Sequence, residues 1–516
     1  MSASTPKPPD SLDADSVQED LTGLHAVTSD RSEYSESMFM VMFSQYAVMQ
    51  IVLAATGLVR NKVIALRLGP SAFGEIAQLG AVVASLVVFV SLGMQVSLSR
   101  NVARAGTHAE RQAYLANANG LVLLLSVLVT GAALALLATG DLLTVVGLPV
   151  TRVVVIAAVL FSAGIPLIVL QTNFLAVLQG QLDIKGLALR RSLAVLLATA
   201  ACVPLVWVFG LVGAAATTLI LNALLALLLG LRCRSLGYQW LAVRLNRDVI
   251  VVLLSFGLAS MAAGFAATFA DTAVRASLLK QFGTDAMGLV QAPLVLAATL
   301  QAVVIGSIGS MSLAAVSRAS SHDETGRTID RLLKVSVPLS TVAFSLLGLL
   351  GVPIIIALYS GQFAGGAALL PWILCADLVQ VAVWVVGATL LAYGDRAIWL
   401  ALELVWSGAE LVISLALLPR FGAVAYGMGM LFAIVIHLAL NLVMVQVRYN
   451  LRIGWANGAR LLAGLAIVAL VAVIGAYWTT SAPAMIAASV IWLAYASYVV
   501  RSTPLAARFR SVLPGG

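Results

Sequence analysis

The first residues in this sequence that could do chemistry are cations beside a long apolar segment. Arg60 and Arg67 are seven residues apart, so they share one face of a helix. Their guanidinium groups could bind phosphate with paired hydrogen bonds, which the ammonium group of Lys62 cannot form. The alternative is that both arginines extend into lipid headgroups, because Arg60 lies about 33 Å along a helix that begins at Met38. The spacing leaves both interpretations open.

A second charged pair follows near the middle of the chain. Asp271 and Arg275 are four residues apart, a spacing at which side chains on a helix meet and neutralise each other. A structural ion pair is one interpretation. The other is a gate whose ion pair opens when a phosphate competes for Arg275.

Three carboxylates fall inside apolar segments, where a charge costs about 2.5–3.5 kcal/mol to insert. Asp377 lies near the middle of one segment, and Glu403 and Glu410 share a helix face in the next. Such groups can exchange protons near neutral pH, which suits coupling or gating, but they can equally form polar contacts between helices. His437 and Asn441, four residues apart, are expected to form a structural hydrogen bond.

The elements that must hold these residues are membrane helices. Hydrophobic residues make up 61% of the 516 residues and charged residues 10%, with a mean hydropathy of +1.02, whereas soluble chains carry about 25% charge. Because unpaired backbone groups are costly in hydrocarbon, each apolar stretch of about 20 residues should be a helix. The sequence predicts an all-α integral membrane protein with about fourteen spans, at residues 38–59, 74–98, 114–138, 153–178, 186–208, 211–231, 249–269, 286–315, 335–358, 364–392, 397–418, 423–446, 461–478 and 482–499.

The distribution of lysine and arginine predicts the orientation. With a cytoplasmic N-terminus, 23 of the 30 cations fall on the cytoplasmic side, so both termini are expected there and the net charge of +8 reflects this bias. The cations are scattered over short loops, which argues against nucleic-acid binding. No cofactor or metal site is expected, because the three cysteines show no paired spacing.

Internal repeats divide the chain into two halves. The pattern Gly-x-x-Ala-[Phe/Met]-Gly at residues 69–74 recurs at residues 283–288, and three further short matches follow at nearly the same offset. Six spans per repeat is an even number, which predicts two parallel lobes with a substrate path between them. The predicted organisation is a disordered cytoplasmic tail (1–36), a first lobe (37–232), a linker (233–248), a second lobe (249–446), two extra spans (447–500) and a cytoplasmic tail (501–516).

Motifs of ATP hydrolysis, metalloproteolysis and nucleophilic catalysis are absent from the sequence. The chain is therefore not expected to be an enzyme, and any transport must draw on an ion gradient, the membrane potential or the gradient of the substrate.

The sequence resembles the multidrug/oligosaccharidyl-lipid/polysaccharide (MOP) flippase superfamily and, within it, the Wzx-type polysaccharide exporters. Three segments carry the resemblance, at residues 57–74, 271–288 and 353–363. The first contains Arg60 followed by Asn61, where lipid II flippases tend to carry an acidic residue, and this difference argues against lipid II as cargo.

The resemblance implies a two-lobe flippase in the bacterial inner membrane that moves lipid-linked oligosaccharide for polysaccharides such as O-antigen or exopolysaccharide. It implies cavity cations that bind substrate, namely Arg60, Arg67 and Arg275, and partners that include membrane lipids, a polysaccharide polymerase and a chain-length regulator. Two alternatives stay open: a cation-coupled drug antiporter of the same superfamily, favoured by Asp377 and Glu410, and a membrane polymerase or ligase, disfavoured by the short predicted outer loops.

Overall fold

The computed structural model describes residues 36–319, 321–451 and 453–502, and these residues are almost entirely helical. The predicted tails at 1–36 and 501–516 lie almost wholly outside this range. Eleven helical segments are long and apolar enough to cross a membrane. The chain is thus a multi-pass membrane protein.

The described helices follow one another with short connections. Their bounds are α2 (Glu36–Ser91), α3 (Met94–Arg104), α4 (His108–Thr139), α5 (Asp141–Val145), α6 (Arg152–Ala163), α7 (Ile165–Gly180), α8 (Ile184–Ser235), α9 (Arg247–Ser317), α10 (His322–Leu358), the 3-10 helix η1 (Gly361–Leu369), α11 (Leu370–Ala392), α12 (Arg396–Phe421), α13 (Val424–Tyr449), α14 (Trp455–Tyr477) and α15 (Ala482–Ser502).

Three of the longest helices reverse direction at a glycine. The backbone leaves the helical region at Gly69 in α2, Gly210 in α8 and Gly283 in α9, each with a positive φ that glycine adopts without steric cost. Each of these helices therefore contains two spans, so the eleven segments are compatible with the fourteen expected. The first span continues to this reversal, beyond its expected end at residue 59, so Arg60 and Arg67 lie on the helix itself.

The repeat seen in the sequence is a repeat of these reversals. Gly69 has φ 74° and ψ −173°, and its counterpart Gly283 has φ 81° and ψ 176°. Gly210 has φ 58° and ψ −127°, and its counterpart Gly422 has φ 57° and ψ −141°. Matching residues thus perform matching backbone turns, which supports two halves of six spans each.

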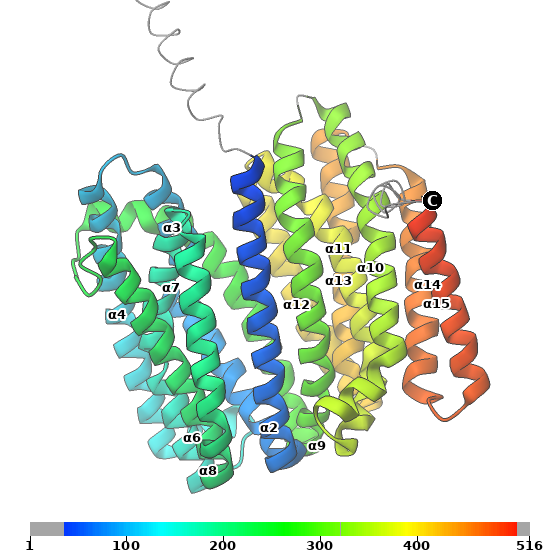
Figure 1. The fold of residues 1–516 in the computed structure, drawn as a ribbon, viewed down its shortest axis with the longest axis horizontal. Coiled ribbons are helices and arrows are strands. Elements are labelled where there is room, and N and C mark those ends of the chain that lie inside the picture. Colours follow the sequence, from blue (N-terminus) through cyan, green and yellow to red (C-terminus); the bar gives the residue numbers. More distant parts are fainter. Residues whose placement is uncertain (1–35, 320, 452, 503–516) are drawn as a thin grey trace, which may run out of the picture.

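The two halves lie on either side of α2 and α9. Figure 1 shows α3, α4, α6, α7 and α8 gathered on one side of α2, and α10, α11, α13, α14 and α15 on the other. α2 and α9 pack against each other along much of their length, and α14 and α15 add to the second half through α10. The start of α2 and the end of α15 lie at the same face of the bundle (Figure 1).

The three segments that carry the family resemblance meet beside the reversal of α2 at Gly69, at the end of its first span. Ser71 Oγ lies 2.6 Å from Thr284 Oγ1, and a Cβ on Gly74 would lie 2.8 Å from the backbone nitrogen of Gly288. Phe73 packs edge-on against the rings of Tyr359 and Phe363, with centroids 5.5 and 5.6 Å away. The two repeated turns and the Tyr359–Phe363 segment therefore close this end of the molecule together.

Candidate functional site

The second half contains an open cavity of 580 Å³ lined by α9, α11, α12 and α13. Small residues on α9 make room for the cavity, and larger polar and aromatic side chains line it. The residues that give the wall its chemistry are Asp271, Arg275, Gln291, Gln301, Gln380, Trp384, Trp406, Glu410 and Tyr426. Such a concave site with a few polar groups among apolar ones is typical of ligand binding.

Asp271 and Arg275 form the expected ion pair at the wall of this cavity. Arg275 Nε lies 2.8 Å from each carboxylate oxygen of Asp271, one helical turn earlier on α9. The side chain of Arg275 is 10% exposed and that of Asp271 is 32% exposed. Both side chains line the cavity, and the carboxylate is the more exposed of the two.

Two further residues fix the guanidinium group of Arg275. Its Nη1 donates to Gln291 Oε1 at 2.6 Å, and its Nη2 donates to the hydroxyl of Tyr426 at 3.4 Å. That hydroxyl in turn donates to Asp271, and the guanidinium carbon lies 5.6 Å from the centre of the Tyr426 ring. Both segments of α9 and the start of α13 thus hold one charge network, which a ligand must break or extend.

A second cavity of 420 Å³ adjoins the first. The two share four wall residues, which are Ala267, Gln380, Trp384 and Trp406. Glu403, His437 and Asn441 line the second cavity, so the seven-residue spacing of Glu403 and Glu410 places one carboxylate in each. The His437 ring stacks on Trp406 at 5.6 Å, and Asn441 donates to the backbone oxygen of His437 at 2.9 Å.

Asp377 lies behind the cavity wall. It is 3% exposed, and its Oδ1 accepts a hydrogen bond from Gln301 Nε2 at 2.8 Å. Its other oxygen, Oδ2, is buried without a hydrogen-bond partner in the described part of the chain. Since Gln301 itself lines the cavity, it connects Asp377 to that space. A buried carboxylate oxygen without a donor is a costly arrangement that a bound proton or cation would relieve.

The structure does not bring Arg60 and Arg67 to either of these cavities. Arg60 is half-buried on α2, and its Nε has no hydrogen-bond partner among the described residues. Arg67 is exposed, and its guanidinium carbon lies 5.5 Å from the centre of the Trp207 ring on α8. Of the predicted cations, Arg275 alone lines the cavities described above.

Several residues of the cavity were not predicted from the sequence. Gln291, Gln301 and Gln380 are amides inside apolar spans, and that contrast was the available signal. Tyr426 follows the turn at Gly422 by four residues, and only the folded arrangement shows that it reaches Arg275. The tryptophans gave no signal, because aromatic residues are ordinary in membrane helices.

No cluster of three or more histidine, cysteine, aspartate or glutamate side chains suited to a metal ion occurs within the described residues. The three cysteines are buried and free. Outside the spans, hydrogen bonds from the Tyr449 hydroxyl and from Arg448 lower the pKa of Asp395, which lies between α11 and α12. Asp395 thereby ties the start of α12 to the end of α13.

A sequence-family model described as "Polysaccharide biosynthesis protein" matches residues 43–310. No curated protein matches the chain.

Solved structures of transporters share the fold. Lipid II flippase MurJ in an inward closed conformation superimposes with a TM-score of 0.71 at 12% identity, covering 88% of this chain and 98% of that one. An inward-facing multidrug resistance MATE family transporter of the MOP superfamily gives 0.63 at 16% identity, covering 78% and 98%. An outward-facing MATE family transporter of the same superfamily gives 0.59 at 15% identity, covering 80% and 95%.

Proposed function

Because the chain belongs to the polysaccharide biosynthesis protein family and has the MOP transporter fold, we propose that it carries lipid-linked oligosaccharides across the bacterial inner membrane. The family and fold are those of flippases, as the sequence resemblance indicated. The specific cargo of this proposal is an oligosaccharide repeat unit on undecaprenyl diphosphate. Translocation of this cargo needs no cofactor, because it forms and breaks no covalent bond.

The observation that carries the proposal is the mixed lining of the cavity in the second half. Gln291, Gln301 and Gln380 offer amides that both donate and accept hydrogen bonds, as sugar hydroxyls require. Trp384 is 44% exposed and, with Trp406, offers ring faces on which the apolar side of a sugar can stack. A site of amides and aromatic faces fits a glycan better than it fits a purely apolar ligand.

The cations and carboxylates take separate roles in this proposal. Arg275 meets the phosphate of the head group when Asp271 releases it, and Arg60, whose Nε lacks a partner among the described residues, offers a second phosphate contact. Arg67 fits an anchor at the membrane interface, since it stacks on the exposed ring of Trp207. Asp377, Glu403 and Glu410 remain the candidates for coupling to an ion gradient.

Alternating access supplies the movement. The two halves meet through the repeated turns at Gly69–Gly74 and Gly283–Gly288, where small residues allow close approach of backbones. With both termini in the cytoplasm, as we propose, this contact closes the outer end of the path. Separation of the halves at this end would expose the head group outside, while the polyprenyl tail stays in lipid.

Export in a deletion strain tests the proposal. Loss of the protein should leave undecaprenyl-diphosphate oligosaccharide on the cytoplasmic side, and the wild-type gene should restore surface polysaccharide. Arg275→Lys keeps the charge but loses the separate donors to Asp271, Gln291 and Tyr426 and the paired hydrogen bonds to phosphate, so it should reduce export strongly. Lys280→Gln is the matched control, because this exposed side chain lies on the same helix outside the cavity. Unchanged polysaccharide in the deletion strain, together with increased dye sensitivity, refutes the proposal.

A matched pair on α2 tests the role of the half-buried cation in the first span. Arg60→Glu should abolish export without changing the amount of protein in the membrane. Lys62→Glu makes the same charge reversal at an exposed position two residues away and should leave export intact. Export that persists in the Arg60 variant removes this residue from the substrate path.

One observation favours a second function, cation-coupled drug antiport. The two cavities are lined by three carboxylates, Asp271, Glu403 and Glu410, but by one of the predicted cations, Arg275. Carboxylates suit a cationic cargo. In that case Glu410→Gln should raise sensitivity to lipophilic cations and leave surface polysaccharide unchanged. If the protein is a flippase, Glu410→Gln should instead reduce surface polysaccharide and leave sensitivity to lipophilic cations unchanged.

A further inference from the structure

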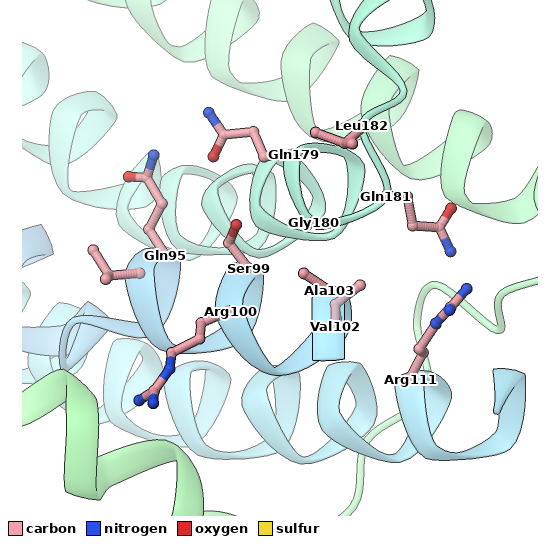
Figure 2. Close-up of a pocket in the computed structure, with 11 residues that line it drawn as sticks. Gln95, Ser99, Arg100, Val102, Ala103, Arg111, Gln179, Gly180, Gln181 and Leu182 are labelled. Atoms are coloured by element: carbon pink, nitrogen blue, oxygen red, sulfur yellow. The ribbon is translucent and has the colours of Figure 1, made fainter. Parts of the chain in front are cut away.

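A cavity of 780 Å³ lies in the first half between α3, the end of α7 and the start of α4 (Figure 2). It is at the face of the bundle where α2 begins and α15 ends (Figure 1). Its wall is rich in groups that bind polar ligands, namely Gln95, Ser99, Arg100, Arg111, Gln179 and Gln181. No sequence motif predicted it, and it is separate from the cavities of the second half.

This cavity arises from a break in the repeat. After Ser91 the chain turns at Leu92, with φ 49°, and Gly93, with φ 69°, and α3 then leaves the line of α2. The matching residues of the second half, 307–309, continue within α9. A leucine with positive φ is disfavoured and persists only where the surrounding structure holds it. The first half thus turns at Leu92 and Gly93, where the second half continues as one helix.

Close packing at one point fixes the two walls. A Cβ on Gly180 would lie 2.6 Å from the backbone oxygen of Ser99 and 3.0 Å from Val102 Cβ, so α3 and α7 touch there. Figure 2 shows the side chain of Ser99 rising toward α7 beside this contact. The walls therefore cannot close further, and the polar side chains around the contact keep their spacing.

The two cations lie at the two ends of the cavity, and backbone contacts hold Arg111 in place. Nε and Nη2 of Arg111 donate to the backbone oxygen of Ala105 at 3.3 and 3.1 Å. The amide of Gln181 donates to the hydroxyl of Tyr238, and Figure 2 shows Gln181 and Arg111 extending toward each other. Arg100 lies at the other end of the cavity (Figure 2). A ligand would meet preorganised donors, which lowers the entropic cost of binding.

Arginine residues of both halves interact electrostatically around Arg100. Desolvation, and then the charges of Arg104 and Arg396, lower the pKa of the Arg100 guanidinium. Arg104 lies on the same helix, but Arg396 is the first residue of α12 in the second half. Like charges from both halves therefore act on one another at this face, and a bound anion would relieve their repulsion.

We propose that this cavity binds the sugar-phosphate head of the lipid-linked oligosaccharide before the head reaches the cavity of the second half. This assignment rests on the proposed function. Guanidinium groups bind phosphate oxygens with paired hydrogen bonds, and the glutamine amides and Ser99 pair with sugar hydroxyls. An anionic phospholipid would satisfy the cations alone and leave the amides of Gln95 and Gln179 without a role.

Binding to the full-length protein in phosphatidylcholine nanodiscs tests the proposal. The probe is farnesyl diphosphoryl N-acetylglucosamine, a short glycosyl diphosphate, with inorganic pyrophosphate as competitor. Arg100→Gln and Arg111→Gln should each weaken binding about tenfold to one hundredfold, because each removes a charge-assisted contact. Gln179→Leu, which leaves every charge and the Ala105 contact intact, should weaken binding of the probe and leave competition by pyrophosphate unchanged.

The matched control is Arg234→Gln, which removes an equal charge from an exposed position at the end of α8, in the same half but outside the cavity wall. The proposal is overturned if this variant loses as much affinity as Arg100→Gln, or if Gln179→Leu binds the probe as the wild type does. The final measurement repeats probe binding in nanodiscs that also contain phosphatidylglycerol. Displacement of the probe by that lipid at this site assigns the cavity to phospholipid and also overturns the proposal.

The outcomes separate this inference from the proposed function. Variants of Arg100 and Arg111 that bind and export normally, while Arg275→Lys fails to export, disprove the cavity assignment alone. A wild-type protein that neither binds the probe nor restores polysaccharide refutes both.

Discussion

The contact between the two repeated turns makes a quantitative prediction about the conformational equilibrium. A Cβ on Gly74 would lie 2.8 Å from the backbone nitrogen of Gly288 and 3.2 Å from Met287 Cβ, and it would also strike the backbone oxygen of Thr284. Two of these three atoms belong to the backbone, which cannot move aside like the end of a flexible side chain. Gly74→Ala should therefore push α2 and α9 apart at this end.

The magnitude follows from the cost of overpacking, about 1–3 kcal/mol. The ordinary gain of alanine over glycine in a helix, about 0.5–1 kcal/mol, applies in every conformation and cancels from the equilibrium. The clash applies only where the two turns touch. At 1.4 kcal/mol per factor of ten, the population with this end separated should rise by about 5- to 150-fold.

Thiol labelling measures this shift. A cysteine introduced by Ser71→Cys lies beside Thr284 in the contact, and the native cysteines are buried. Its reaction with a membrane-impermeant maleimide, added from outside to intact cells, should accelerate when Gly74→Ala is combined with it. Gly80→Ala is the control, because it makes the same change on the same helix segment with no atom within 4 Å of the new Cβ. Equal labelling rates in the two variants would refute the reasoning.

Three further predictions concern single contacts. Asp377→Asn keeps the hydrogen bond from Gln301 but removes an ionisable group, so gradient-driven export should fall by about 5- to 150-fold, the usual range of coupling energies, as measured by flux at different external pH. Gly475→Ala should lower the thermal stability of the detergent-solubilised protein by about 1–3 kcal/mol, because its Cβ would strike the backbone oxygen of Gly348 on α10. Asp395→Asn should lower stability at neutral pH, because the Tyr449 hydroxyl holds the pKa of Asp395 below its ordinary value of 3.8.

Each of these has its own check. Export by the Asp377 variant that still follows external pH excludes this residue from coupling. Gly458→Ala, on the same helix as Gly475 with nothing within 4 Å of the new Cβ, should leave stability unchanged or slightly higher. For Asp395, the stabilisation is present above pH 3.8 and is lost as the pH falls through the lower folded-state pKa. The difference between wild type and variant should therefore shrink in acid, and a constant difference contradicts the assignment.

The sequence alone determined the membrane class, the approximate number of spans and the repeat. These follow from composition and from glycine positions, because lipid forces every apolar segment of sufficient length to be a helix and because only glycine turns readily with positive φ. The Asp271–Arg275 pair was also readable, since a spacing of four residues on one helix fixes the neighbours without any tertiary information.

Tertiary structure decided which charges share a space. The helix that carries Arg60 runs on to Gly69 and brings Arg67 to the ring of Trp207 on α8. Arg275 instead reaches Tyr426, which is 151 residues away in the chain, through the packing of α13 on α9. The cavity between α3 and α7 lies beside a turn at Leu92, whose positive φ is disfavoured for leucine and so could not be predicted from residue type. Local spacing fixes neighbours along one helix, whereas contacts between helices depend on how all of them pack together.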